Sequence, residues 1–396
     1  MEALVNWTEL FTPFDTLIDC IRVERNLTNA NNFLCGLSKV FGTLLAYIFP
    51  FIGTFNFINN SIVAAVFLIP LRRENRYYIF LGILAIADIG INFFIGWLWL
   101  FPSFGVPFAT SGSVYYFILT RSVESCRLLT FLQTFWCNLR GIVYIILAFD
   151  RLLLMYQPLG QKIPSKYLTI ILLIIAFTTS IAISIPIGIY YGFKKVRNFF
   201  SCWYIDYGRF LSFYQVLLSN SCLFHLAIVS LFDILLLVKI IRWSRSRHKM
   251  TDKASTLNMK QISPTITLLV LNAVSFVSSL PSGVTYMILV CMTDASLEFA
   301  RSITFLIYLS LILMMLQSAF NILLYYVRME KFRQVLLKSF LCHCIHTRLS
   351  SSIRSSTNLL LRGLGLDGGG GGGDIGGVNL FTSTVYMYND LKLCIK

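Results

Sequence analysis

Seven long apolar segments, separated by short polar or charged stretches, dominate the hydropathy pattern of this chain. Their approximate limits are 44–70, 77–100, 116–150, 168–191, 210–241, 263–291 and 302–326. As a helix, each is long enough to cross the roughly 30 Å hydrocarbon core of a bilayer. Because unpaired backbone polar groups are too costly in lipid, these segments must be helices rather than open sheet. The pattern predicts an all-α membrane protein, a bundle of seven transmembrane helices.

The regions around these segments suggest four parts of the chain. We expect an extracellular N-terminus over 1–43 and the helical bundle over 44–326. Residues 327–341 mix basic with apolar side chains, which suits a short amphipathic eighth helix on the inner leaflet. Residues 342–396 are rich in serine and contain a glycine run, a composition typical of a disordered cytoplasmic tail.

The composition agrees with a membrane protein and indicates its orientation. Hydrophobic residues make up 56% of the chain and the mean hydropathy is +0.72, too apolar for a soluble domain. In a soluble protein the net charge of +15 would suggest nucleic acid as a partner. Here most Lys and Arg residues fall on the side of the C-terminus, which the positive-inside rule assigns to the cytoplasm. We therefore expect a multi-pass plasma-membrane protein with an external N-terminus, contacts to anionic lipid and no nucleic-acid partner.

The expected outer side carries two kinds of extracellular feature. Asn6 and Asn26 each begin an Asn-x-Thr glycosylation triplet. Cys20, Cys35 and Cys291 lie near the outside, where disulfides can form. Any two of these three cysteines are candidates for a bridge.

Polar residues in three of the segments fall at one depth. Asp88 and Arg140 each lie about 11 residues from the expected cytoplasmic end of their helices, a depth of roughly 16 Å. Asn60 lies at roughly 15 Å, and Gln317 and Asn321 at or somewhat below this level. A lone charge there would cost several kcal/mol, so we expect Asp88 and Arg140 to neutralise each other in a central polar cluster. The pair would either fix helix packing or take part in a switch, and the two roles are compatible.

The third segment carries markers at both ends. Cys126 lies 25 residues before Arg151, which is roughly 37 Å of helix. One spanning helix thus places a thiol at one face and the pair Asp150-Arg151 at the other. This arrangement resembles the third helix of rhodopsin-like (class A) G-protein-coupled receptors, where the cysteine forms an outer disulfide and an Asp-Arg-Tyr triplet meets the G protein. The resemblance implies that Cys126 pairs with Cys202, which also falls at an outer position.

Motifs in other segments extend the resemblance over about 44–342. Asn60 with Val63 is similar to the family's Asn-x-x-Val, and the stretch ending at Asp88 to its Leu-Ala-x-x-Asp. Residues 321–325 are similar to Asn-Pro-x-x-Tyr, with isoleucine in place of proline. The chain looks most like divergent invertebrate peptide receptors, flatworm orphan groups among them. The resemblance implies a receptor with no enzymatic activity and no cofactor, and the residues suggest no catalytic or metal site.

Several positions depart from the family pattern. Arg140 stands where the family has a small polar residue lining a sodium site beside the aspartate, so its guanidinium should fill that site and exclude the ion. Ser279 replaces the usual tryptophan of the sixth helix. His225 and Asp233 replace the proline and tyrosine of the fifth. We expect Asp233 either to pair with Arg151 or to form an interhelical hydrogen bond.

The resemblance places a ligand pocket near the outer ends of helices three, five, six and seven. Gln133 stands where amine receptors carry an aspartate, and Met315 where opsins need a lysine, so neither ligand is expected. The remaining candidates are Gln133, Trp136, Cys137 and Tyr286. An aromatic pocket with amide groups suits a short, amidated peptide.

We therefore expect a receptor that senses an extracellular neuropeptide and activates heterotrimeric G proteins. The candidate coupling and switch residues are Asp150, Arg151, Asp233, Asn321 and Tyr325.

Further features of the tail predict modification and regulation. Cys342 and Cys344 are candidate palmitoylation sites, and the serine clusters beyond them are candidate phosphorylation sites that would recruit arrestin.

Two other interpretations of the function stay open. Buried acids and bases would line an ion path in a seven-helix channel or transporter. Substituted switch residues would suit a receptor-like protein that no longer signals.

Overall fold

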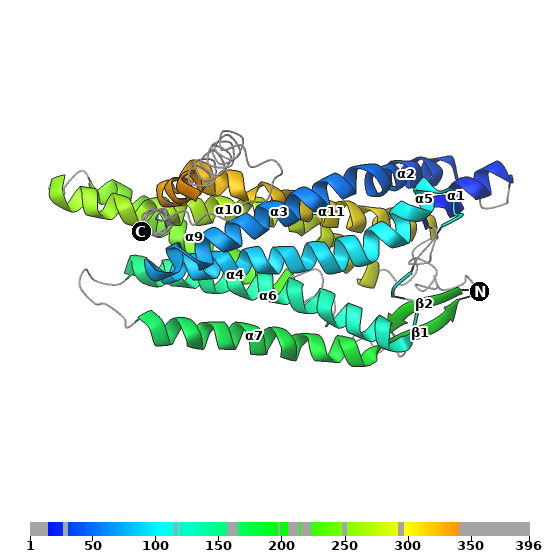
Figure 1. The fold of residues 1–396 in the computed structure, drawn as a ribbon, viewed down its shortest axis with the longest axis horizontal. Coiled ribbons are helices and arrows are strands. Elements are labelled where there is room, and N and C mark those ends of the chain that lie inside the picture. Colours follow the sequence, from blue (N-terminus) through cyan, green and yellow to red (C-terminus); the bar gives the residue numbers. More distant parts are fainter. Residues whose placement is uncertain are drawn as a thin grey trace, which may run out of the picture. The chain divides into compact units, whose positions relative to one another are not determined.

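The computed structural model describes ten stretches of the chain. These are residues 15–26, 31–114, 117–119, 121–156, 165–196, 199–204, 214, 223–247, 252–291 and 297–339. The chain divides into two compact units, Met1–Met329 and Glu330–Lys396. In the described part of the first unit, long helices lie side by side (Figure 1). In the second unit, residues 330–339 are helical.

The described long helices form seven rods, two of which combine several elements. The first rod consists of α2 (Asn32–Thr43), the π-helical η2 (Leu44–Ile48) and α3 (Phe49–Leu68). After the short turn η3 (Leu71–Arg73), the second consists of α4 (Arg76–Ile91), the π-helical η4 (Asn92–Gly105) and α5 (Val106–Ala109). The others are α6 (Val123–Tyr156), α7 (Ser165–Tyr190), α9 (Leu223–Arg247), α10 (Asp252–Cys291) and α11 (Leu297–Arg328). The remaining helix, α1 (Asp15–Glu24), precedes the first rod.

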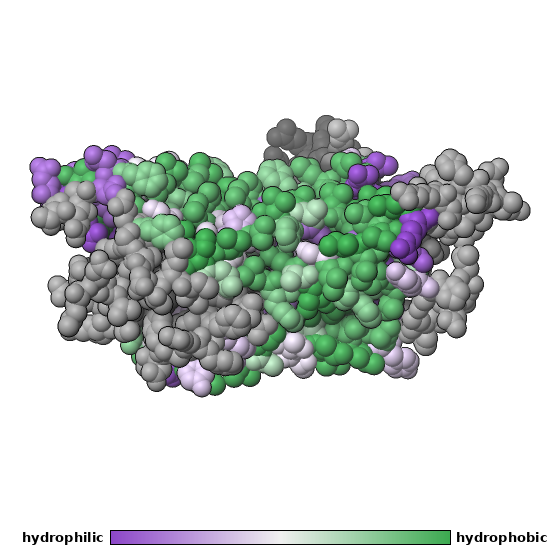
Figure 2. Space-filling model, turned by 180° about the vertical axis from the view of Figure 1, so that it is seen from behind, coloured by the Kyte–Doolittle hydropathy of each residue, from purple (hydrophilic) through white to green (hydrophobic). Residues whose placement is uncertain are grey.

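Six of these rods are long and apolar enough to cross a membrane. The remaining rod, α6, carries Gln133, Asn138 and Arg140 in its middle part, and all three side chains are buried. On the face drawn in Figure 2, apolar residues cover the middle and hydrophilic residues gather toward the two ends. The predicted helical membrane bundle is therefore confirmed.

Several rods begin at other residues than predicted; α10, for example, begins at Asp252 rather than at residue 263. The first begins at Asn32 rather than at residue 44, because the Asn31 side chain accepts two backbone N–H groups (2.8 and 3.3 Å) and caps the helix. The rod is about 15 Å longer than expected. The third begins at Val123 rather than at residue 116, where Ser122 Oγ accepts the N–H of Ser125 (3.0 Å).

Two asparagines of α3 fix this helix against α11. Asn56 Nδ2 donates to the carbonyl oxygen of Met315 (2.7 Å), and Asn59 Nδ2 donates to that of Ala319 (3.0 Å). Buried amides need hydrogen-bond partners where no water can supply them. These bonds therefore set the register between the first and last rods.

Two disulfides lie at one end of the bundle, which we call the disulfide end. Cys20 and Cys35 join α1 to α2, and Cys126 and Cys202 join the start of α6 to strand β2 (Phe199–Tyr204). The opposite end, where Arg151 lies near the end of α6, is the Arg151 end (Figure 1).

An antiparallel hairpin at the disulfide end was not predicted from the sequence. Strand β1 (Tyr191–Val196) follows α7 directly and pairs with β2, with Tyr191 opposite Tyr204. Besides the disulfide, Arg127 Nε of α6 donates to the carbonyl oxygen of Tyr191 (3.0 Å). Both links tether the hairpin to α6.

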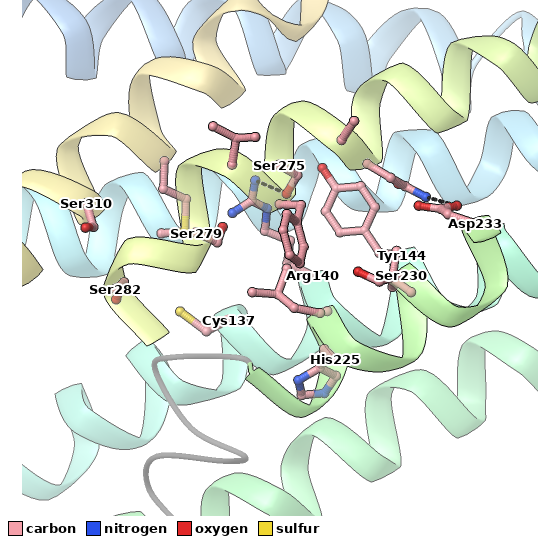
Figure 3. Close-up of a pocket in the computed structure, with 18 of the residues that line it drawn as sticks. Cys137, Arg140, Tyr144, His225, Ser230, Asp233, Ser275, Ser279, Ser282 and Ser310 are labelled. Carbon is pink, nitrogen blue, oxygen red and sulfur yellow. Dashed lines mark hydrogen bonds between the residues drawn. The ribbon is translucent and has the colours of Figure 1, made fainter. Parts of the chain in front are cut away.

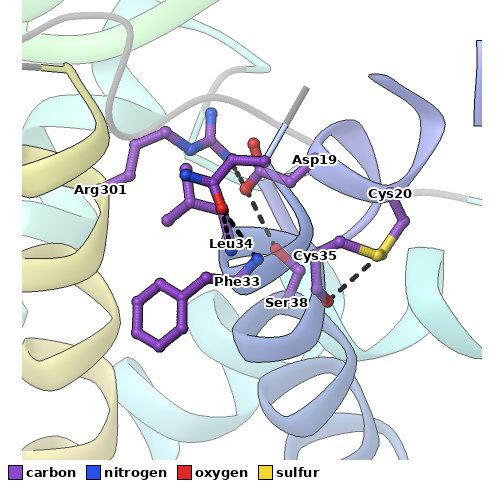
Figure 4. Close-up of a disulfide and its surroundings, with 8 residues drawn as sticks. Asp19, Cys20, Phe33, Leu34, Cys35, Ser38 and Arg301 are labelled. Carbon is purple, nitrogen blue, oxygen red and sulfur yellow. Dashed lines mark hydrogen bonds and ion pairs between the residues drawn. A yellow bond between two sulfur atoms is a disulfide. The ribbon is translucent and has the colours of Figure 1, made fainter. Parts of the chain in front are cut away.

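A buried ion pair fastens the N-terminal helices to α11 (Figure 4). Arg301 lies 2.7 Å from Asp19 Oδ2, and Ser38 Oγ donates to the same oxygen (3.1 Å). The two charged side chains are only 3% and 5% exposed. We call Asp19, Ser38 and Arg301 the N-terminal clasp. The bond between Cys20 and Cys35 holds Asp19 in place beside α2, which resolves the choice among three cysteines that the sequence left open.

Replacing Asp19 by alanine should lower the stability of the receptor on the order of 3 kcal/mol, because it removes the carboxylate from a buried ion pair. The thermal melting midpoint of purified protein measures this. Glu24→Ala is the matched control, since it removes an exposed acid from the same helix. Equal midpoints for the two variants would mean that the clasp does not hold the N-terminal helices.

Candidate functional site

Four buried side chains from α4, α6 and α11 form a closed ring in the bundle. Arg140 Nε lies 3.0 Å from Asp88 Oδ1, and a terminal nitrogen of Arg140 donates to Gln317 Oε1 (2.7 Å). Gln317 Nε2 in turn donates to Asn321 Oδ1 (2.7 Å). Asn321 Nδ2 closes the ring by donating to Asp88 Oδ2 (3.4 Å). We call these four residues the polar ring.

The polar ring follows from the cost of charge in an apolar medium. Each of its side chains is less than a tenth exposed, so an acid and a base there must compensate each other. From its depth in the sequence, Asn60 was also expected in this cluster. Asn60 Nδ2 instead donates to Asn56 (3.1 Å) and, more weakly, to Ser318 (3.4 Å). Asn60 therefore belongs to the contact between α3 and α11, not to the ring.

A fourth helix reaches the ring through a weaker bond. Arg140 donates to Ser275 Oγ of α10 over 3.4 Å, as Figure 3 shows. Movement of α10 away from α6 would break this bond and leave the rest of the ring closed.

A cavity of about 310 Å³ lies beside the ring, between α6, α9, α10 and α11 (Figure 3). Cys137 and Tyr144 on its α6 wall are 11 and 18 residues beyond Cys126. The cavity therefore spans depths of roughly 16 to 27 Å below that disulfide. We call it the central cavity. Its polar lining includes Arg140, Tyr144, His225, Ser230, Asp233, Asn272, Ser275, Ser279, Ser282 and Ser310.

Of the four residues predicted to line a ligand pocket, only Cys137 faces the central cavity. Gln133 Nε2 donates to the carbonyl oxygen of Phe94 (3.1 Å), which lies in the π-helical η4. Trp136 packs against Gly90, where an added Cβ would lie 2.2 Å from the indole. Tyr286 is part of the main apolar core. Gln133 and Trp136 thus face the second rod instead.

Asp233 forms an interhelical hydrogen bond and not the alternative ion pair with Arg151. Asn272 Nδ2 of α10 donates to Asp233 Oδ1 of α9 (3.0 Å). Asn272 could not be predicted as this partner, since a single amide in an apolar segment does not reveal what it contacts.

His225 reaches the cavity because α6 carries a glycine opposite to it. A Cβ on Gly141 would lie 2.6 Å from His225 Cγ, so only glycine allows this close approach. The His225 Nδ1 atom is buried and has no hydrogen-bond partner in the described part of the chain. The same holds for Asn272 Oδ1 and Ser282 Oγ.

At the Arg151 end, side chains of α4 cover two of the predicted coupling residues, Asp150 and Arg151. The Arg151 guanidinium lies 3.8 Å from the ring centroid of Tyr77, and its Nε is 3.9 Å from Asp150. Asp150 in turn lies 2.6 Å from Arg76. Arg151 is only 4% exposed, so its charge is hidden in this arrangement.

Tyr325, the last residue of the Asn-x-x-x-Tyr stretch, is fully buried near the same end of α11. Its ring meets that of Phe67 edge to face at 5.2 Å. This contact adds an aromatic link between the first and last rods.

The predicted modification sites are largely outside the described residues. Asn26 is exposed in the turn after α1, which suits a glycosylation site. Asn6, Cys342 and Cys344 lie outside the described residues, and their roles stay predictions.

The polar ring predicts strong coupling between its two charges. Asp88→Asn or Arg140→Met alone should cost about 3–5 kcal/mol, because each leaves the opposite charge in the bundle without its counter-charge. The double variant should recover part of this loss, with a coupling energy of about 1–3 kcal/mol. Melting midpoints of the four proteins complete the cycle. Additive losses would show that the two charges do not act as a pair.

Comparison with known families agrees with this architecture. The family described as 7 transmembrane receptor (rhodopsin family) matches residues 59–325, about two thirds of the chain. The match begins at Asn59 in α3, ends at Tyr325 in α11 and includes the whole polar ring. No curated protein matches the chain. The chain therefore belongs to the rhodopsin family of seven-transmembrane receptors.

Proposed function

We propose that this receptor senses an extracellular peptide at the disulfide end and activates heterotrimeric G proteins at the Arg151 end. Its family makes it a signalling receptor. The observation that supports the proposal best is that the Tyr77 ring covers the buried Arg151 guanidinium. The Arg151 guanidinium is held against Tyr77 at the end of α6, and the polar ring fixes the same helix about three turns away, at Arg140.

The mechanism is a two-state equilibrium transmitted along α6. Arg140 and Arg151 are 11 residues apart on this helix, roughly 16 Å. In the resting state the ring is closed and Arg151 is covered. A ligand that prefers the other arrangement shifts the population toward an uncovered Arg151. A desolvated cation–π contact contributes about 2 kcal/mol, so its loss changes the population ratio by roughly thirtyfold.

Charge and redox chemistry support the proposed orientation. Disulfides persist in oxidising surroundings, which places the disulfide end outside the cell. Arg72, Arg73 and Arg76 follow the first rod at the Arg151 end, and the positive-inside rule places such residues in the cytoplasm. Both arguments suit a plasma-membrane receptor with an external N-terminus.

The hairpin at the disulfide end supports a peptide as the ligand. A two-stranded sheet has edges that can pair with an extended peptide backbone. The disulfide between Cys126 and Cys202 joins the hairpin to α6. A peptide paired with the hairpin would therefore act on the helix that carries Arg140 and Arg151. A monoamine is disfavoured as the ligand, because the Gln133 side chain is uncharged and cannot form an ion pair with an ammonium group.

A screen of amidated peptides in cells that report calcium and cAMP would test the ligand class. A response that disappears in Arg151→Ala cells supports G-protein coupling. A ligand-evoked current that persists with G proteins blocked would favour an ion channel instead.

Loss of the Tyr77 ring should activate the receptor without a ligand. Tyr77→Leu uncovers Arg151 and is expected to raise basal nucleotide exchange on G proteins at least tenfold in nanodiscs. Tyr78→Leu is the matched control, because it removes the neighbouring ring, which stacks on Phe67 instead. The activation should vanish in Tyr77→Leu/Arg151→Ala. Equal basal exchange in the two single variants would refute the cover over Arg151.

The receptor should not respond to sodium, because Arg140 and Asn321 already occupy both oxygens of Asp88. Its melting midpoint should be the same in sodium chloride and in choline chloride at equal ionic strength. Arg140→Ser introduces the small polar residue typical of the family, and should make the midpoint rise with sodium. A sodium-dependent midpoint in the unmodified receptor would contradict this account.

A further inference from the structure

The central cavity has an uncompensated acid. Arg140 is its basic lining residue in the described part of the chain, and Asp88 already neutralises that charge within the polar ring. Asp233 is its acidic lining residue, and its described contact is one hydrogen bond from Asn272. The cavity therefore carries excess negative charge where α9 meets α10.

Hydrogen-bond acceptors are concentrated at this same place. Because Asn272 Nδ2 is committed to Asp233, Asn272 Oδ1 is left as a buried acceptor with no donor among the described residues. A buried acceptor without a donor destabilises the folded protein. A molecule with a protonated amine would compensate both the acceptor and the charge.

The cavity reaches the lipid-facing surface between α9 and α10. Three of its lining residues, Ile234, Ala273 and Val277, are exposed there. All three are apolar, and exposed apolar side chains such as Leu231 and Leu235 continue along α9. A molecule that enters by this route comes from the bilayer and must be lipophilic.

The size and shape of the cavity limit its occupant. Its volume of about 310 Å³ equals that of about ten water molecules, near the lower limit for small-molecule sites. Asp233 lies at one end, while Ser282 and Ser310 lie at the other (Figure 3). The wall between them includes Leu226, Val229 and Phe276. This space suits a small aryl-alkyl group and not a peptide.

We propose that the central cavity binds a small lipophilic amine that enters from the bilayer between α9 and α10. The ammonium donates to the Asp233 carboxylate and to Asn272 Oδ1, and the apolar body packs against Leu226, Val229 and Phe276. The site is distinct from the position of Gln133, nearer the disulfide end, where amine receptors carry an aspartate and this receptor carries an uncharged amide. Amine binding is measured directly and does not depend on whether the receptor couples to G proteins.

Three isosteric probes test the charge preference on purified full-length receptor in nanodiscs. They are 3-phenylpropylamine, the neutral 3-phenylpropanol and the anionic 3-phenylpropanoate, with dissociation constants measured by ligand-observed NMR. The amine should bind at least tenfold more tightly than either analogue. Equal affinity for amine and alcohol, or tightest binding of the carboxylate, would overturn the proposal.

Matched variants locate the amine. Asp233→Asn should abolish the preference for the amine, while Glu124→Gln, which removes an exposed acid from the disulfide end of α6, should keep it. Ser279→Trp leaves Asp233 in place and fills the cavity with an indole, so it should abolish amine binding while the receptor still melts cooperatively. Retained amine binding in Ser279→Trp overturns the proposal even if Asp233→Asn does not fold.

Discussion

The ion pair between Asp88 and Arg140 is the constraint on which the bundle depends. Two opposite charges lie 3.0 Å apart where lipid and apolar side chains exclude water. Neither can stay charged there without the other, so α4 and α6 must approach at one height. Gln317 and Asn321 satisfy the remaining donors and acceptors and bring α11 to the same level. The neutral, closed ring also argues against an ion path through these residues.

Arg140 gives this receptor an internal cation at the centre of its helices. A guanidinium is covalently attached to α6, so the charge beside Asp88 cannot leave as a diffusible ion does. The arrangement of α6 is then tied to the second and seventh rods, and Arg151 at the end of the same helix is covered by Tyr77 of α4. Both contacts are made to α4, so the same pair of helices is joined at two depths of the bundle.

From the sequence, the depth of a residue in the membrane could be predicted better than the direction in which its side chain points from the helix axis. The apolar runs located the seven rods, and counting residues from the helix ends brought Asp88 and Arg140 to one level. Counting does not determine rotation, so Gln133 was assigned to a pocket although it faces Phe94, and Asn60 was assigned to the ring although it faces Ser318. The π-helical segment η4 and the hairpin after α7 left no periodic signal in the sequence by which they could be predicted.

Infrared difference spectroscopy tests most directly whether the Asp88 carboxyl is ionised in its pair with Arg140. Spectra of the receptor and of Asp88→Asn, both in lipid, differ by the bands of this single carboxyl group. The account predicts that the variant loses an ionised carboxylate stretch. Loss of the carbonyl stretch of a protonated acid would show that the two helices are not held together by opposite charges.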